Sequence, residues 1–235
     1  MVAVVFIASF PAGPWQTNCY LVAPGDQGPC VVIDPGVGAL GPVHDLVAEH
    51  GLEPRGVLLT HGHIDHLYSA VDVCAAYDVG CWIHPGDRAR LTDPYEIAGA
   101  REVVEQELGH ARDFSGREPA VVHEVADREP ITLAGLAFEP LHAPGHTPGS
   151  TLYRIAPQEP ETRSLVFTGD VVFAGSIGRV DLPGGDAATM RETLRTVVLE
   201  LADDTVLLPG HGGQTTMSRE RASNPYLSAQ GLTSF

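Results

Sequence analysis

The segment Thr60-His61-Gly62-His63-Ile64-Asp65-His66 places four potential metal-binding side chains within six residues, directly after the apolar run 56–59. Four such side chains cannot all point the same way from a regular strand or helix. We therefore expect them to converge from a loop in which Gly62 supplies conformational freedom. Imidazole and carboxylate together suit zinc, iron or manganese better than calcium, which prefers shells made wholly of oxygen. The segment thus predicts a metal site at the end of a strand.

Three further donors follow, each at the predicted end of a strand and each beside glycine. His146 lies in Ala143-Pro144-Gly145-His146-Thr147-Pro148-Gly149-Ser150, Asp170 ends Phe167-Thr168-Gly169-Asp170, and His211 lies in Leu208-Pro209-Gly210-His211-Gly212. A lone histidine in such a turn is usually an ordinary polar residue. An H-x-H-x-D-H segment followed by three more strand-end donors instead indicates a metal centre, because loops on a rigid scaffold are where proteins position chemistry.

Short β-type runs bounded by glycine or proline predict strands, and longer periodic segments predict helices. Strands are expected at residues 2–7, 19–22, 31–33, 57–60, 81–84, 120–125, 131–133, 136–141, 151–155, 165–168 and 205–208. Helices are expected at residues 43–50, 69–79, 186–201 and 217–230, and the more polar segment 88–116 is also expected to be helical. Strands open each half and helices close it, which favours an α/β (α+β) fold of two face-to-face sheets with helices outside.

The composition is that of one globular domain spanning residues 1–235. A formal charge of −16 disfavours a nucleic-acid partner, because the protein would repel phosphate. No apolar run is long enough to span a membrane, and residues 2–7 lack the basic start of a secretory signal, so we expect a cytoplasmic protein without a membrane partner. The chain has no lysine, which excludes Schiff-base chemistry on that residue. The four cysteines form no C-x-x-C pair and are expected to be buried thiols.

Over nearly its whole length the chain resembles the metallo-β-lactamase superfamily. The resemblance implies an αββα sandwich of two mixed β-sheets flanked by helices, with two bound divalent metal ions. Zinc is the expected metal, and iron or manganese are the alternatives. β-Lactam hydrolysis is disfavoured, because true lactamases of the superfamily lack the bridging aspartate in this arrangement. The resemblance assigns the first ion to His61, His63 and His146, the second to Asp65, His66 and His211, and a bridge between them to Asp170.

Within the superfamily the chain is most similar to the short bacterial type of glyoxalase II, the hydroxyacylglutathione hydrolases. The likeness lies in residues 167–186, which include the loop Gly178-Arg179-Val180-Asp181, and in residues 215–226. It implies that a metal-bridging hydroxide hydrolyses a small acyl-thioester, S-lactoylglutathione or an analogue, with catalytic roles for Asp65 and Asp170. Arg179 matches a cationic position that meets the carboxylate of the thiol cofactor. Alternatively, Arg179 forms a buried pair with Asp181 that shapes the loop.

Two other activities stay open at this level. A persulfide dioxygenase with a single iron shares the H-x-H-x-D-H segment but uses only two histidines and one aspartate, so a competent His211 favours the two-metal hydrolase. A lactonase or other ester hydrolase would use the same centre. The longer glyoxalase II enzymes grip glutathione with a C-terminal helical domain that this sequence does not contain, so the thiol is not specified. The sequence specifies neither the acyl group nor the oligomeric state.

Four residues outside this set are candidates for supporting roles. His84 and His142 lie near the metal-binding loops and are candidates for orienting the ligands through hydrogen bonds. Trp15 and Tyr20 are candidates for bordering the pocket, although an aromatic residue in a first hairpin is more often part of the core. The segment 88–116 is expected either to cover the pocket or to form a dimer contact.

Overall fold

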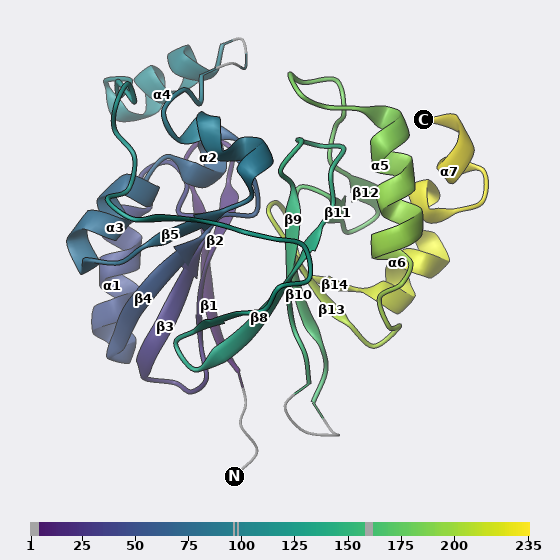
Figure 1. Ribbon diagram of the computed structural model, residues 1–235, viewed down its shortest axis with the longest axis horizontal. Coiled ribbons are helices and arrows are strands. Elements are labelled where there is room, and N and C mark those ends of the chain that lie inside the picture. Colours follow the sequence, from purple (N-terminus) through teal and green to yellow (C-terminus); the bar gives the residue numbers. More distant parts are fainter. Residues whose placement is uncertain (1–4, 96, 98, 158–161) are drawn as a thin grey trace.

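The computed structural model describes residues 5–95, 97, 99–157 and 162–235 (Figure 1). In this part of the chain the first sheet is mixed, with β1 to β3 antiparallel and β3 to β6 parallel. Its strands, in spatial order, are β1 (Phe6–Ala12), β2 (Thr17–Ala23), β3 (Gly28–Ile33), β4 (Leu52–Leu58), β5 (Cys81–Ile83) and β6 (Val122–Glu124). The same half contains the helices α1 (Leu40–His50), α2 (Ile64–Leu67), α3 (Ala70–Tyr77) and α4 (Ala100–Leu108), and the 3₁₀ helix η1 (Pro85–Leu91).

The second sheet is also mixed, because β10 and β13 are parallel whereas the other neighbours are antiparallel. Its order is β14 (Thr215–Thr216), β13 (Val206–Pro209), β10 (Leu165–Gly169), β9 (Thr151–Ile155), β8 (Leu136–His142) and β7 (Ile131–Leu133). A small hairpin joins β11 (Val172–Phe173) to β12 (Ser176–Ile177). The remaining helical segments are α5 (Ala187–Thr193), the π-helical η2 (Leu194–Val198), α6 (Met217–Ser223), the 3₁₀ helix η3 (Pro225–Leu227) and α7 (Gly231–Ser234).

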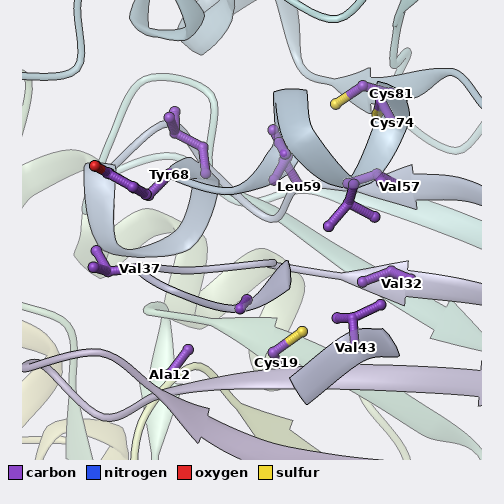
Figure 2. Packing of buried hydrophobic residues seen from close by; sticks show 14 of the residues in the cluster. Ala12, Cys19, Val32, Val37, Val43, Val57, Leu59, Tyr68, Cys74 and Cys81 are labelled. Carbon is purple, nitrogen blue, oxygen red and sulfur yellow. The ribbon is translucent and has the colours of Figure 1, made fainter. Parts of the chain in front are cut away.

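Alternating side chains divide the core into layers, because successive residues of a strand point to opposite faces of its sheet. On β2, Tyr20 and Val22 pack between the two sheets, whereas Cys19 and Leu21 pack on the outer face of the first sheet. The outer cluster includes residues from α1 and α3, and part of it is shown in Figure 2. A third cluster packs the second sheet against α5, η2 and α6. The layers are therefore helices, sheet, sheet and helices, which confirms the expected fold class.

The four cysteines are buried and free, as expected. None of the helices among the described residues is long and apolar enough to cross a membrane.

Several element boundaries differ from the sequence-based expectations. Of the strand expected at residues 2–7, residues 2–4 lie outside the described part, and the strand continues to Ala12 through Pro11. Proline is tolerated there because β1 is an edge strand of the sheet. The helix expected at residues 186–201 is α-helical only to Thr193 and then becomes π-helical. The helix expected at residues 217–230 ends at Ser223, ahead of Pro225.

The segment 88–116 is only partly helical. It contains the end of η1 and all of α4, while residues 96 and 98 lie outside the described part. Helix α4 ends at Gly109, which adopts a left-handed conformation with φ of 75°. Left-handed glycines terminate helices, and residues 109–117 then form bends, a turn and irregular chain.

Candidate metal centre

The seven predicted donors meet at the carboxyl ends of the strands. His61 and His63 follow β4, and His63 has extended backbone. Asp65 and His66 lie on the single turn of α2, so the segment predicted to be a loop is a loop only in its first half. The last three donors come after β8, β10 and β13, and they are His146, Asp170 and His211, respectively. Each half of the fold thus contributes donors to one place.

Three imidazoles form the first group. The Nδ1 atom of His63 lies 3.1 Å from Nε2 of His61 and 2.9 Å from Nε2 of His146. A tetrahedral zinc ion with bonds of about 2.0–2.1 Å separates its nitrogen ligands by roughly 3.3–3.4 Å. All three side chains are buried, and their nitrogens lie close to the separation that one ion requires.

Asp65, His66 and His211 form the second group. The Oδ2 atom of Asp65 lies 3.4 Å from Nε2 of His66 and 3.3 Å from Nε2 of His211. Asp170 lies between the two groups. Its Oδ1 is 3.3 Å from His66 Nε2, and its Oδ2 is 3.3 Å from His211 Nε2 and 3.6 Å from His146 Nε2. The geometry therefore gives Asp170 access to both groups at once.

The electrostatics of the two groups differ. Burial and neighbouring histidines lower the pKa of His61, and burial followed by the charge of His146 lowers the pKa of His63 to about 3. Burial also lowers the pKa of His146. These three rings are therefore neutral at pH 7, and a neutral imidazole has the lone pair that a metal requires.

Protons hold the second group together when no metal is bound. Burial would lower the pKa of His211, but its contacts with Asp170 and Asp65 raise it to about 9. Burial would likewise raise the pKa of Asp65, but the charge of His66 and the contact with His211 lower it to about 2. A metal binding here would replace the imidazole protons as the counter-charge to the carboxylates.

Hydrogen bonds on the far side of each ring set its tautomer. The Nδ1 atoms of His66, His146 and His211 lie 2.9 Å from Asp34 Oδ2, 2.7 Å from Arg179 O and 3.0 Å from Trp15 O. Each Nδ1–H therefore donates to an oxygen, so that Nε2 faces the centre and offers its lone pair once it carries no proton.

Asp34 supports two of the candidate ligands. Besides accepting from His66, it accepts from the backbone N–H of Thr60 at 2.8 Å and from its hydroxyl at 2.6 Å. The Thr60 hydroxyl in turn lies 3.1 Å from Nδ1 of His61. Asp34 is buried and has a left-handed φ of 51°. A non-glycine residue rarely adopts this conformation, and its hydrogen bonds hold it there.

Asp87 joins two of the metal-binding loops. It is fully buried, and its Oδ2 accepts from Gly62 N at 2.8 Å and from the Thr147 hydroxyl at 2.6 Å. Its Oδ1 accepts from Gly149 N at 3.0 Å and from Arg90 at 2.9 Å. The loop of His61 and His63 is thereby bonded to the loop of His146 through one carboxylate.

The reason for Gly62 differs from the one predicted. Its backbone is not left-handed, but a Cβ atom there would lie 2.7 Å from Cδ of Arg90 and 3.0 Å from Cβ of Asp87. The loop therefore needs glycine for space, so that its N–H can reach the Asp87 carboxylate.

The hairpin between β1 and β2 supports the last donor loop. Thr17 donates to Asp65 Oδ2 at 2.8 Å, and Asn18 Nδ2 donates to the carbonyls of Pro209 and Gly212 at 2.9 and 2.8 Å. The bonds from Asn18 and the Trp15 carbonyl hold the loop of His211, and the bond from Thr17 orients Asp65.

Five of the seven donors line a cavity of about 600 Å³, and they are His63, Asp65, His146, Asp170 and His211. Of the two aromatic candidates, Trp15 lines the cavity, whereas Tyr20 lies in the core and donates to Pro209 O at 2.7 Å. Arg179 also lines the cavity and binds both oxygens of Asp181, at 2.7 and 2.8 Å. The alternative of a buried pair was wrong, because the two side chains are 62% and 67% exposed.

His84 and His142 stack on each other, with ring centroids 3.9 Å apart. His142 Nε2 lies 2.9 Å from the carbonyl of Pro148 in the His146 loop, and His84 accepts from Gly86 N at 3.1 Å. His142 thus supports one of the loops, and the bonding role expected toward the donor rings belongs instead to Asp34 and to backbone carbonyls.

The donor set fits a pair of metal ions. Imidazole and carboxylate are the ligands that zinc, iron and manganese accept. His66 Nε2 and Asp170 Oδ1 are buried without a hydrogen-bond partner, although buried polar atoms are almost always satisfied. Metal ions would satisfy both atoms.

Sequence reasoning missed Asp34 and Asp87. Asp34 directly follows the apolar residues 31–33 and precedes Pro35-Gly36, and Asp87 follows Pro85-Gly86 soon after the strand β5. Like the donors, both follow a strand, and a glycine lies within two residues of each, so the same signal could have found them.

The chain is similar to known proteins over most of its length. The family profile of the metallo-beta-lactamase superfamily matches residues 12–211. Hydroxyacylglutathione hydrolase GloC of Haemophilus influenzae is 35% identical over 95% of this chain and 99% of its own. The crystal structure of BLEG-1 B3 metallo-beta-lactamase has a TM-score of 0.81 and 31% identity, covering 95% of this chain and 100% of that one. The crystal structure of TTHA1623 in a di-iron-bound form has a TM-score of 0.75 and 34% identity, covering 94% and 100%.

Proposed function

Because the chain belongs to the metallo-β-lactamase superfamily of metal-dependent hydrolases, we propose that it is a dinuclear hydrolase that cleaves the thioester of a small thiol. The observation that carries the proposal is the position of Asp170, which contacts members of both donor groups beside a cavity. His61, His63 and His146 would hold one ion, Asp65, His66 and His211 the other, and Asp170 would bridge them. The relative named hydroxyacylglutathione hydrolase supports the choice of a thioester.

The proposal assigns chemical roles to the carboxylates of the centre and to the groups that hydrogen-bond its imidazoles. Two divalent ions would acidify a water molecule and polarise the thioester carbonyl. In this proposal the carboxylates of Asp65 and Asp170 would accept the proton that such a water releases. Asp34 and the carbonyls of Trp15 and Arg179 keep the imidazole lone pairs directed at the centre.

The cavity favours a thioester over substrates that need an acid to release the leaving group. Among the described residues that line it, the titratable groups are the candidate ligands and Arg179. A thiol with a pKa of about 8.5 leaves as thiolate without receiving a proton, whereas an amine or alkoxide requires one. Arg179, at the side of the cavity, is the proposed contact for an anionic group of the thiol, and Asp181 must then share its guanidinium.

The test is metal content per chain, measured on protein purified without chelator, beside hydrolysis of S-lactoylglutathione followed by thioester absorbance. We expect about two metals per chain and turnover. One iron per chain with oxygen uptake on glutathione persulfide, and no hydrolysis, would establish a dioxygenase instead. A lactone and a β-lactam belong in the same assay, the latter because a similar solved structure is a B3 metallo-beta-lactamase. Faster turnover of either one would refute the thioester assignment.

A further inference from the structure

Apolar side chains dominate the cavity away from the metal centre. One wall consists of Ala100 and Val103 on α4 together with Ile97, and the other contains residues of the β11–β12 hairpin and the loop after it. The apolar residues that line the cavity are Trp15, Ile64, Ile97, Ala100, Val103, Phe173, Ile177 and Leu182. An apolar substrate group that covers this surface contributes favourably to the free energy of binding. A hydroxyl-bearing group contributes nothing there, because the apolar side chains offer it no hydrogen-bond partner.

Charge in the cavity is sparse outside the donor set. Among the described lining residues, Arg179 is the cation beyond the candidate ligands. Its two guanidinium contacts are already made with Asp181, and both side chains are mostly exposed. Glutathione carries two carboxylates and one ammonium group, so a single shared, solvated arginine provides at most one weak ion pair.

We propose that the natural substrate is a thioester with an apolar acyl group, which packs against Val103 of α4 and Phe173 of β11. This inference rests on the proposed thioester hydrolysis and names its substrate class. Water oxygen bonds to the carbonyl carbon, the C–S bond breaks with its electron pair moving to sulfur, and the products are a carboxylate, a thiol and the proton left over. An apolar acyl group would occupy the cavity next to the carbonyl, while the thiol needs no more than one anionic group.

Helix α4 provides this wall through a specific arrangement of its side chains. Val104 is buried in the first core cluster, whereas Val103 is half-buried and lines the cavity. The exposed side chains of the helix are three acidic residues, Glu102, Glu105 and Glu107, together with Arg101 and Gln106. The helix therefore presents an apolar side chain to the cavity within a surface of net negative charge, which would disfavour an anionic substrate.

The test is a series of acetyl, butanoyl and hexanoyl thioesters, each made with glutathione and with uncharged N-acetylcysteamine. Each methylene that becomes buried is expected to raise kcat/KM about fourfold. Glutathione is expected to raise kcat/KM no more than about fivefold over N-acetylcysteamine, because one exposed ion pair contributes little. S-lactoylglutathione should be turned over more slowly than the butanoyl thioester of the same thiol.

Val103→Thr should flatten the dependence on chain length, because it replaces a methyl group of the wall by a hydroxyl group. Val47→Thr is the matched control, since Val47 is a half-buried valine on α1 that does not line the cavity. The slope is measured within each variant and so does not depend on its overall activity. No dependence on chain length in the native protein, or a glutathione preference far above fivefold, would overturn the inference while leaving thioester hydrolysis established. Failure to hydrolyse any thioester would instead refute the proposed function.

Discussion

Asp87→Asn is expected to weaken both the fold and one half of the metal centre. The substitution keeps the size of the side chain but replaces one acceptor oxygen by an N–H donor. The native carboxylate accepts two hydrogen bonds on each oxygen, so whichever way the amide turns, two of the four donors lose their acceptor. A buried donor without an acceptor costs about 1–3 kcal/mol, which gives a loss of about 2–6 kcal/mol in the free energy of unfolding.

Urea denaturation of the metal-free protein measures this loss. Asp203→Asn is the matched control, because Asp203 also binds an arginine, Arg221, at 2.9 Å but is 70% exposed. The control should lose no more than about 1 kcal/mol. If Asp87→Asn fails to fold, Thr147→Val leaves the Asp87 carboxylate in place, removes the hydroxyl bonds of Thr147 to Asp87 and Ser150, and allows the same measurement.

A competitive chelator titration separates the effect on the metals. Asp87 bonds to the loops that carry His61, His63 and His146, so the affinity of that group should fall about 10- to 100-fold. The group containing Asp65 and His211 should change much less. An equal loss of affinity for both metals, or a free energy of unfolding as high as that of the control, would show that Asp87 does not position the first group.

Three further outcomes are expected. Asp170→Ala should lower metal affinity by more than about 100-fold and abolish most hydrolysis, because both donor groups lose a contact; full metal content and activity would contradict the bridge. Arg179→Gln should lower kcat/KM for glutathione thioesters by no more than about fivefold and leave N-acetylcysteamine thioesters unchanged. Because the pKa of His211 rises from 6.5 to about 9 in the folded, metal-free protein, its stabilising effect is complete below pH 6.5 and disappears as the pH rises through 9. The Tm of metal-free protein should therefore fall across this window, whereas that of metal-loaded protein should not.

The sequence predicted the donors well because their chemistry is local. His61, His63 and Asp65 lie within one short segment, and the glycines beside His146 and His211 mark strand ends that a parallel arrangement brings together. The layer order was also predictable, since it follows from the strand and helix pattern together with the family resemblance. The π-helical turn after Thr193 was not, because it depends on tertiary packing rather than on the periodicity of the segment.

The contacts around the donors were harder to predict because they join distant segments. Asp34 reaches His66 across 32 residues, and Asp87 reaches Thr147 across 60 residues. Nothing in the local sequence specifies these partners. The exposure of the Arg179–Asp181 pair likewise depends on how its loop lies over the cavity.

The bonds between the β1–β2 hairpin and the last donor loop have a consequence for folding. Trp15 and His211 are 196 residues apart in the sequence, and Tyr20 and Pro209 are 189 apart. Contacts of such long range form slowly, because most of the chain must be ordered before the ends meet. During synthesis the β1–β2 hairpin is made first, and its bonds to the last donor loop form only after that loop has been made. We therefore expect the metal centre to be completed late in folding. A chain able to bind both ions has then already joined the β1–β2 hairpin to the last donor loop.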